Sequence, residues 1–213
     1  KELFQSALDE AMRPKPGWVE KRLGEVCDSV LGKMLDRMKN RGRPEKYLRN
    51  VNVRWGSFDL SNLLEMGFEE DEQERFGLRS GDLVMCEGGE PGRCAVWSGV
   101  PAKMKFQKAL HRIRCPKELN PYFLYYQFRA QAGAGVLQKY FDGRDATIKH
   151  LTGKLLKTVL LFIPSLAEQK EILKRLGALA EKTDLLQQHY TRQIADCAEM
   201  RQSVLREAFE GRL

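Results

Sequence analysis

A chain of 213 residues with 42% hydrophobic residues is long enough for one domain with an apolar core and an extension. Its five cysteines are odd in number and include no CxxC pair, which argues against a disulfide framework and a zinc site and is typical of a reducing compartment. The sequence shows no signal peptide and no apolar run of membrane-spanning length, so we expect a soluble, cytoplasmic protein without a membrane partner.

The formal net charge of +7 is unevenly distributed along the chain. Residues 13–165 contain 27 Lys and Arg and 18 Asp and Glu, a net charge of +9, whereas the remaining residues contain 9 and 11, a net charge of −2. A basic surface on one domain indicates a polyanionic partner, most often a nucleic acid. Solvated surface charge without a partner is the simpler alternative.

A short helix is predicted at the start of the chain, and its sequence recurs near the end. Residues 2–12 read ELFQSALDEAM, and six of these eleven residues match EMRQSVLREAF at 199–209. Chance similarity between two amphipathic helix ends is the alternative, but the shared Gln-Ser favours an internal repeat. We therefore interpret residues 1–12 as the end of a preceding copy of the C-terminal helix, followed by a domain over 13–165 and a long helix over 166–213.

The first basic segment covers residues 33–54, with eight basic and two acidic side chains. Gly42 and Pro44 interrupt any periodicity, so its middle is predicted to be a loop. The following residues, 47–53, alternate as a strand that carries Tyr47. Basic side chains beside such a strand suit phosphate contact and base reading, whereas a solvent-exposed loop is the simpler explanation.

The second basic segment covers residues 103–117, with six basic side chains and no acid. Its alternation predicts a strand with Arg112 and Arg114 on one face. Together with the turn near residue 144, the two segments supply the predicted DNA-binding residues: Arg41, Arg43, Lys46, Tyr47, Arg49, Arg54, Lys103, Lys105, Lys108, Arg112, Arg144 and Lys149.

Residues 65–74 contain six acids and no base, so we expect them on a face that points away from DNA or toward a partner, with solubility as the simplest role. Residues 78–97 predict two strands around a glycine loop. Gly88, Gly89 and Gly92 could suggest a phosphate-binding loop, but no Gly-Lys-Ser/Thr or helix follows them. A nucleotide site is therefore not expected.

No catalytic, metal or cofactor site is predicted. The tetrapeptide NPYF at 120–123 resembles that of amino-methyltransferases, but it lacks the second proline. Glu168-Gln169-Lys170 has the Glu-x-Lys spacing of a nuclease, although it lies in a helix-capping turn and the chain contains no Pro-Asp. A stand-alone DNA methyltransferase or nuclease with a coiled-coil tail is the alternative function, and a coiled-coil adaptor that does not bind DNA is a second one.

The C-terminal helix is the strongest prediction. Pro164 ends the preceding segment, and Ser165 with Glu168 forms a capping-box pattern. Heptad-like spacing with a stutter at Tyr190 then predicts one helix of about 60 Å that must face another long helix. The alternative is two packed helices broken near Gly177. The predicted helix-pairing residues are Ile172, Leu176, Leu179, Leu186, Tyr190, Ile194, Cys197 and Val204.

Four segments carry a resemblance to a known family: IPSLAEQKEIL at 163–173, the closing RQSVLREAFEGRL, GDLVM…GRCAVW at 81–97, and YLRNVNV at 47–53. They resemble the specificity subunit of type I restriction–modification systems, which is a non-catalytic subunit. The resemblance implies an α+β fold in which a mixed α/β target-recognition domain is followed by a long helix that forms an antiparallel coiled coil.

The resemblance also implies a function and partners. Each recognition domain would read one half of a bipartite site in double-stranded DNA. The helix would hold two domains apart and dock the methyltransferase subunits, and the restriction (motor-nuclease) subunit would join that complex. The second helix would come from a second specificity repeat or from a homodimer.

Overall fold

A four-stranded antiparallel sheet forms the centre of the domain, because two of its strands, Leu83–Cys86 and Cys94–Val96, are apolar and buried on both faces. Its order is β2 (Asp28–Leu31), β10 (Leu110–Arg114), β7 (Leu83–Cys86) and β8 (Cys94–Val96). Leu83 and Met85 face a first core, and Val84 and Cys86 face a second core. The computed structural model describes residues 2–36, 40–143 and 149–211.

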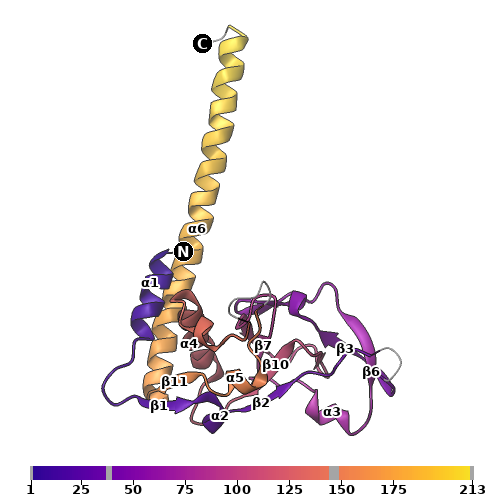
Figure 1. Ribbon diagram of the computed structural model, residues 1–213. Coiled ribbons are helices and arrows are strands. Elements are labelled where there is room, and N and C mark those ends of the chain that lie inside the picture. The colour runs from indigo at the N-terminus through magenta and orange to yellow at the C-terminus, as the bar shows by residue number, and fades with distance from the viewer. Residues whose placement is uncertain (1, 37–39, 144–148, 212–213) are drawn as a thin grey trace.

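The first core lies between the sheet and helical segments (Figure 1). It contains α1 (Glu2–Ala11), α4 (Pro121–Gly133) and the base of α6 (Leu166–Phe209). The pair β1 (Val19–Arg22) and β11 (Leu160–Ile163) joins it to α6. Aromatic residues of α4, including Phe123 and Phe128, are fully buried, so α4 is a core helix rather than a stacking surface.

The second core lies on the other face of the sheet. A three-stranded sheet of order β6 (Leu64–Phe68), β3 (Arg43–Leu48) and β9 (Lys105–Phe106) covers it, with α3 (Glu72–Arg75) and the hairpin β4 (Val53–Arg54) to β5 (Ser57–Phe58). Shorter helical turns complete the fold: α2 (Leu23–Val26), η1 (Asn50–Asn52), η2 (Leu137–Tyr140) and α5 (Gly153–Leu156).

The sequence placed the strand of the first basic segment too late. The structure forms β3 over Arg43–Leu48, inside the predicted loop, and 50–52 is a 3-10 turn. Pro44 is tolerated because β9 pairs only with Tyr47 and Leu48, so no ladder bond is needed on that side of Pro44. The Asn52 carboxamide accepts the backbone N–H of Arg49 at 2.9 Å and so ends the strand.

Helix α6 runs without a break for 44 residues, about 66 Å, and extends as a rod beyond the domain (Figure 1). The alternative of two helices broken near Gly177 is therefore wrong. Ser165 caps the helix, since its hydroxyl oxygen accepts the backbone N–H of Glu168 at 3.3 Å. The Glu168 carboxylate accepts the indole N–H of Trp18 at 3.0 Å, which ties the helix to the domain. The predicted mixed α+β fold with a long C-terminal helix is confirmed.

Candidate nucleic-acid interface

The glycine loop between β7 and β8, residues 87–93, is a meeting point of three other segments. The Asn50 side chain donates to the Gly88 carbonyl at 3.0 Å, and Arg93 donates to the Asn50 carbonyl at 3.0 Å. A Cβ on Gly88 would lie 3.0 Å from Nδ1 of His150, so the loop and the His150 side chain are close together. The Glu87 N–H donates to the Ala109 carbonyl at 2.9 Å.

These contacts bring three segments that are distant in sequence to the loop, and each has a basic residue next to its contact. The Arg93 guanidinium pairs with Glu90 of the loop at 2.7 Å, and Arg49 Nη2 donates to the Asn62 carbonyl at 2.8 Å. Arg49 precedes Asn50, Lys108 precedes Ala109, and Lys149 precedes His150. Lys108 and Lys149 are exposed. Arg93 was not predicted as a DNA-binding residue, and the only signal that could have suggested it is its position at the end of the glycine loop. We name this set of Arg49, Arg93, Lys108 and Lys149 the loop cluster.

Three polar atoms in the loop cluster and its neighbour Asn50 are buried without hydrogen-bond partners among the described residues. They are Arg49 Nε, Arg93 Nε and Asn50 Oδ1. Other nitrogens of both guanidinium groups have partners: Arg93 binds Glu90 and the Asn50 carbonyl, and Arg49 binds the Asn62 carbonyl. A buried polar atom without a partner costs about 1–3 kcal/mol unless water or a ligand binds it.

Other predicted DNA-binding residues are exposed and do not belong to the loop cluster. Arg41, Arg43, Lys46 and Lys103 are exposed, and Arg43 and Lys103 line a groove of about 450 Å³. Arg54 is exposed beside Asp59, with 3.5 Å between Nη2 and Oδ2.

Acidic side chains share the region of this outer groove. Glu45, Glu70 and Glu74 line the same groove, and Lys46 lies opposite Glu65 across the antiparallel pair of β3 and β6. Strand pairing thus brings the acidic segment beside exposed basic residues, and its orientation away from DNA stays a prediction.

Three predicted DNA-binding residues are buried and do not present their side chains to a ligand. Tyr47 is 1% exposed, and Lys105 and Arg112 are 3% and 4% exposed. Lys105 donates to the Gln73 carbonyl at 2.9 Å, and burial lowers the pKa of its ammonium. The structure thus corrects the sequence prediction for these residues, since the alternation that aligned the arginines could not show which face is covered.

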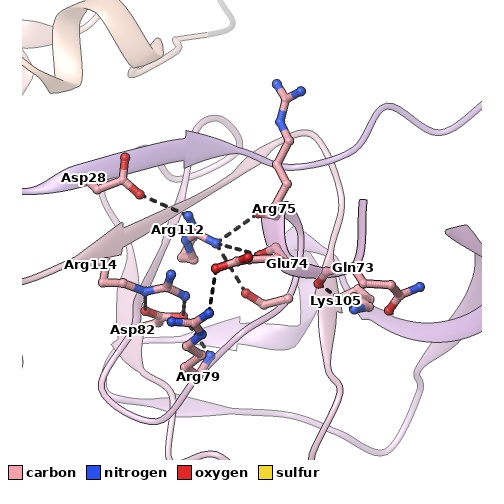
Figure 2. Close-up of polar contacts among 10 residues, drawn as sticks. Asp28, Gln73, Glu74, Arg75, Arg79, Asp82, Lys105, Arg112 and Arg114 are labelled. Atoms are coloured by element: carbon pink, nitrogen blue, oxygen red, sulfur yellow. Dashed lines mark hydrogen bonds and ion pairs between the residues drawn. The ribbon is translucent and has the colours of Figure 1, made fainter. Parts of the chain in front are cut away.

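Arg112 secures the acidic segment from inside the domain (Figure 2). Its Nη1 donates to the carbonyl of Arg75 at 2.9 Å and to those of Glu74 and Gly77 at 3.4 Å, and its Nη2 donates to Asp28 at 3.1 Å. Burial lowers the pKa of the Arg112 guanidinium. These bonds satisfy carbonyls at the end of α3 that a helix leaves without partners.

Arg114 extends this network toward the start of β7 (Figure 2). It binds the buried Asp82 carboxylate with two hydrogen bonds, of 2.7 Å and 2.8 Å. The Asp82 carboxylate raises the pKa of Arg114, chiefly through these hydrogen bonds. The arginines of β10 therefore hold the domain together. Arg144, the remaining predicted residue, lies outside the described residues.

The predicted helix-pairing residues divide into two groups along α6. Ile172 and Leu176 are buried in the first core and Leu179 packs against it, beside α1. The more distal residues Leu186, Tyr190, Ile194, Cys197 and Val204 are all exposed, so no described residue covers that part of the apolar stripe.

A metal site and a membrane span are two further features that residues 2–36, 40–143 and 149–211 could provide. These residues contain no group of three or more His, Cys, Asp or Glu that could hold a metal ion. Within the same residues, no helix has the length and apolar character needed to cross a membrane.

Comparison with known proteins identifies the family. Residues 15–194 match the family model described as type I restriction modification DNA specificity domain. The chain belongs to this family. The type I specificity domain therefore accounts for most of the recognition domain and for more than half of α6.

Two similar relatives are named specificity subunits. The chain is 25% identical over 171 residues to the EcoKI specificity subunit of Escherichia coli K12, and 26% identical over 170 residues to the EcoBI specificity subunit of Escherichia coli. Each match covers 78% of this chain but only 37% and 35% of the relative. The family is thus one of recognition subunits and not of catalytic ones, as the sequence analysis expected.

Two solved structures share the fold. One belongs to a study of complex assembly and conformational transition in the type I R-M system, with a TM-score of 0.74, 21% identity, and coverage of 99% of this chain and 52% of that chain. The other is the HsdS subunit of Thermoanaerobacter tengcongensis, with a TM-score of 0.67, 20% identity, and coverage of 100% and 51%. The chain thus spans about half of each.

Proposed function

We propose that this chain is a DNA-recognition unit of a type I restriction–modification complex. Its domain, about residues 13–165, reads one half of a bipartite site in double-stranded DNA. Its helix, from about residue 166, pairs with a second spacer helix and docks methyltransferase subunits, which the restriction subunit joins, in the cytoplasm. The observation that carries the proposal is the match to the specificity family, together with the exposed Lys108 and Lys149 near the glycine loop.

The loop cluster supplies the two kinds of contact that such reading requires. Lys108 and Lys149 are exposed cations that suit phosphate oxygens, which fix a protein on the duplex without reading its sequence. Arg49, Arg93 and Asn50 have side chains of the kinds that read base edges in the major groove. Base reading by the two arginines would exchange their bonds to Asn62 and Glu90 for bonds to bases. The exposed Arg41, Arg43, Lys46, Arg54 and Lys103 extend the proposed phosphate-contacting surface, and Arg144 stays a prediction.

Neutralising Lys108 and Lys149 one at a time tests this assignment. Each alanine variant is expected to reduce the slope of log affinity against log salt by about one, because one phosphate contact is lost. The half-site preference should not change. Duplex binding by the purified chain, measured over a series of salt concentrations, gives the slopes.

Lys174→Ala is the matched control, since it removes the same charge from the exposed side of α6. Its slope should equal that of the unmodified chain. Unchanged slopes for both loop-cluster variants would show that DNA binds another face, and absence of duplex binding by the parent at low salt would favour the adaptor alternative.

The geometry of α1 supports an antiparallel partner for α6. The chain direction of α1 is opposite to that of α6 (Figure 1), and Glu2, Phe4 and Gln5 share a groove with Ala180 and Thr183. Because residues 2–12 match 199–209, the end of a second long helix would occupy the same position. A two-fold axis relating two such helices would cross α6 within a turn of Tyr190.

The length of α6 is proposed to set the distance between half-sites. Four residues inserted between Gln187 and Gln188 add about 6 Å of helix and slightly more than one turn. Since duplex DNA rises about 3.4 Å per base pair, the non-specific spacer should lengthen by one or two base pairs. Methylome sequencing of cells that carry the variant with its methyltransferase measures the new site.

A one-residue insertion at the same point is the control. It rotates the apolar stripe by about 100° and should reduce assembly and methylation. Methylation at the original spacing by the four-residue variant would show that another part of the complex sets the spacing.

A further inference from the structure

Two of the five cysteines face each other at the edge of the central sheet. Strands β2 and β10 are antiparallel, with Asp28 opposite Arg114. The next pair in this register is Cys27 and Cys115. Cys27 has an extended backbone, with φ −113° and ψ 144°. Pro116 favours an extended conformation for Cys115 as well, so the pair continues the ladder.

The hydrogen-bond pattern shows how close this pair is. Gly32 donates to the Leu110 carbonyl at 2.9 Å, and these residues are opposite each other, so theirs is a hydrogen-bonded pair. Such pairs alternate along the ladder, which makes Cys27 and Cys115 a non-hydrogen-bonded pair with Cα atoms about 4.5 Å apart. The Cys27 N–H donates to Leu23 at 2.8 Å, away from β10, as this arrangement requires. Disulfides form at Cα separations of about 4.4–6.8 Å.

The two cysteines differ in their exposure to solvent. Both belong to the first core, and Cys27 is 6% exposed whereas Cys115 is half-buried. Interaction with the Cys27 thiol is the largest cause that raises the pKa of the Cys115 thiol, followed by burial. The cross-strand register places the two side chains on the same face of the sheet, and a reagent in solvent reaches Cys115 first.

We propose that Cys27 and Cys115 are a dithiol that closes to a cross-strand disulfide on oxidation by a small-molecule disulfide. The small fraction of Cys115 that is ionised attacks one sulfur of the oxidant, forms a mixed disulfide and releases one small thiol, which takes up the proton. The Cys27 thiolate then attacks the sulfur of Cys115 and releases the second small thiol. In balance, the protein loses two thiol protons and two electrons, and the oxidant becomes two thiols. The bond joins the residue before the start of β2 to the residue after the end of β10.

The same sheet contains a second pair of cysteines that cannot close. Cys86 and Cys94 lie on the neighbouring strands β7 and β8, but Cys94 is opposite Met85. Cys86 N–H donates to the Arg93 carbonyl at 2.8 Å. The Cys94 side chain therefore faces the first core and the Cys86 side chain the second core, on opposite sides of the sheet. Cys86 and Cys94 are therefore an internal control: they are also two cysteines on neighbouring strands, but their side chains cannot form a disulfide.

Oxidation of the folded chain with glutathione disulfide tests the proposal. Every protein carries Cys197→Ser, so that the exposed helix thiol does not cross-link copies. We expect the loss of two free thiols and a peptide map that joins Cys27 to Cys115. The melting temperature should rise by roughly 5–10 °C, because the bond closes a loop of about 90 residues, and dithiothreitol should reverse the rise.

Variants separate the two steps. Cys27→Ser should stop at a glutathione adduct on Cys115, and Cys115→Ser should not lose thiols. Cys86→Ser should behave like its parent. The proposal is overturned if the peptide map joins other cysteines, if the parent keeps a stable adduct on Cys115, or if all its thiols persist. The map of the parent decides this even where a variant does not fold.

Discussion

Replacing Leu186 and Ile194 with lysine is expected to abolish pairing of α6 with a second long helix and to leave the domain folded. Both side chains are exposed in the single chain, at 44% and 71%. In a pair each would be buried, with about 1.5–3 kcal/mol from each side chain. Two substitutions on both helices of a pair remove at least about 6 kcal/mol, or roughly a 10⁴-fold loss of affinity. Sedimentation mass at micromolar concentration measures the loss.

The choice of residues follows from the structure. Leu179 was in the predicted stripe, but it packs against the first core, so its substitution would disturb the domain as well. Gln188→Lys with Ala195→Lys is the matched control, because it adds the same charges on the opposite face of the helix. The sedimentation mass should fall to that of a single chain only for the variant with lysines at Leu186 and Ile194, and not for the control. A Leu186 and Ile194 variant with the sedimentation mass of the parent would contradict the pairing proposal.

Replacing Arg112 with alanine is expected to lower the free energy of unfolding by about 2–4 kcal/mol, because a buried carbonyl that loses its donor costs about 1–3 kcal/mol. The guanidinium is 4% exposed and donates to three carbonyls and to Asp28. Without it, the carbonyls at the end of α3 stay buried and lose their donors. Urea unfolding of the purified chain measures the change, and Arg112→Lys should recover only part of it because one ammonium cannot reach all four acceptors.

Arg75→Ala is the control on α3. Its exposed side chain lies over the Phe76 ring at 5.2 Å, and its loss should cost less than about 1 kcal/mol. The comparison also distinguishes a structural role of Arg112 in the buried network from the DNA-binding role that the sequence predicted. If Arg112→Ala unfolds like the parent but binds DNA weakly, then Arg112 contacts DNA and the buried network does not depend on it.

The sequence by itself determined the elements whose signals are local. Ser165 next to Pro164 marks the start of α6, and uninterrupted heptad-like spacing to residue 209 predicts its length, because capping and periodicity depend only on residues within a few turns. The internal match of residues 2–12 with 199–209 predicted a helix at the start of the chain, and α1 occupies Glu2–Ala11. The strands around the glycine loop followed from apolar runs of the right length.

Only the tertiary structure decided which charged side chains are available. Lys105 and Arg112 have the same charge and similar sequence surroundings as Lys103 and Lys108, yet the first two are buried and the second two are exposed. Strand alternation predicts two faces but not which face another segment covers, and α3 covers this one. Likewise, Asn50, Arg93 and Lys149 meet at the glycine loop through contacts between distant segments, and no local pattern of residues encodes such contacts.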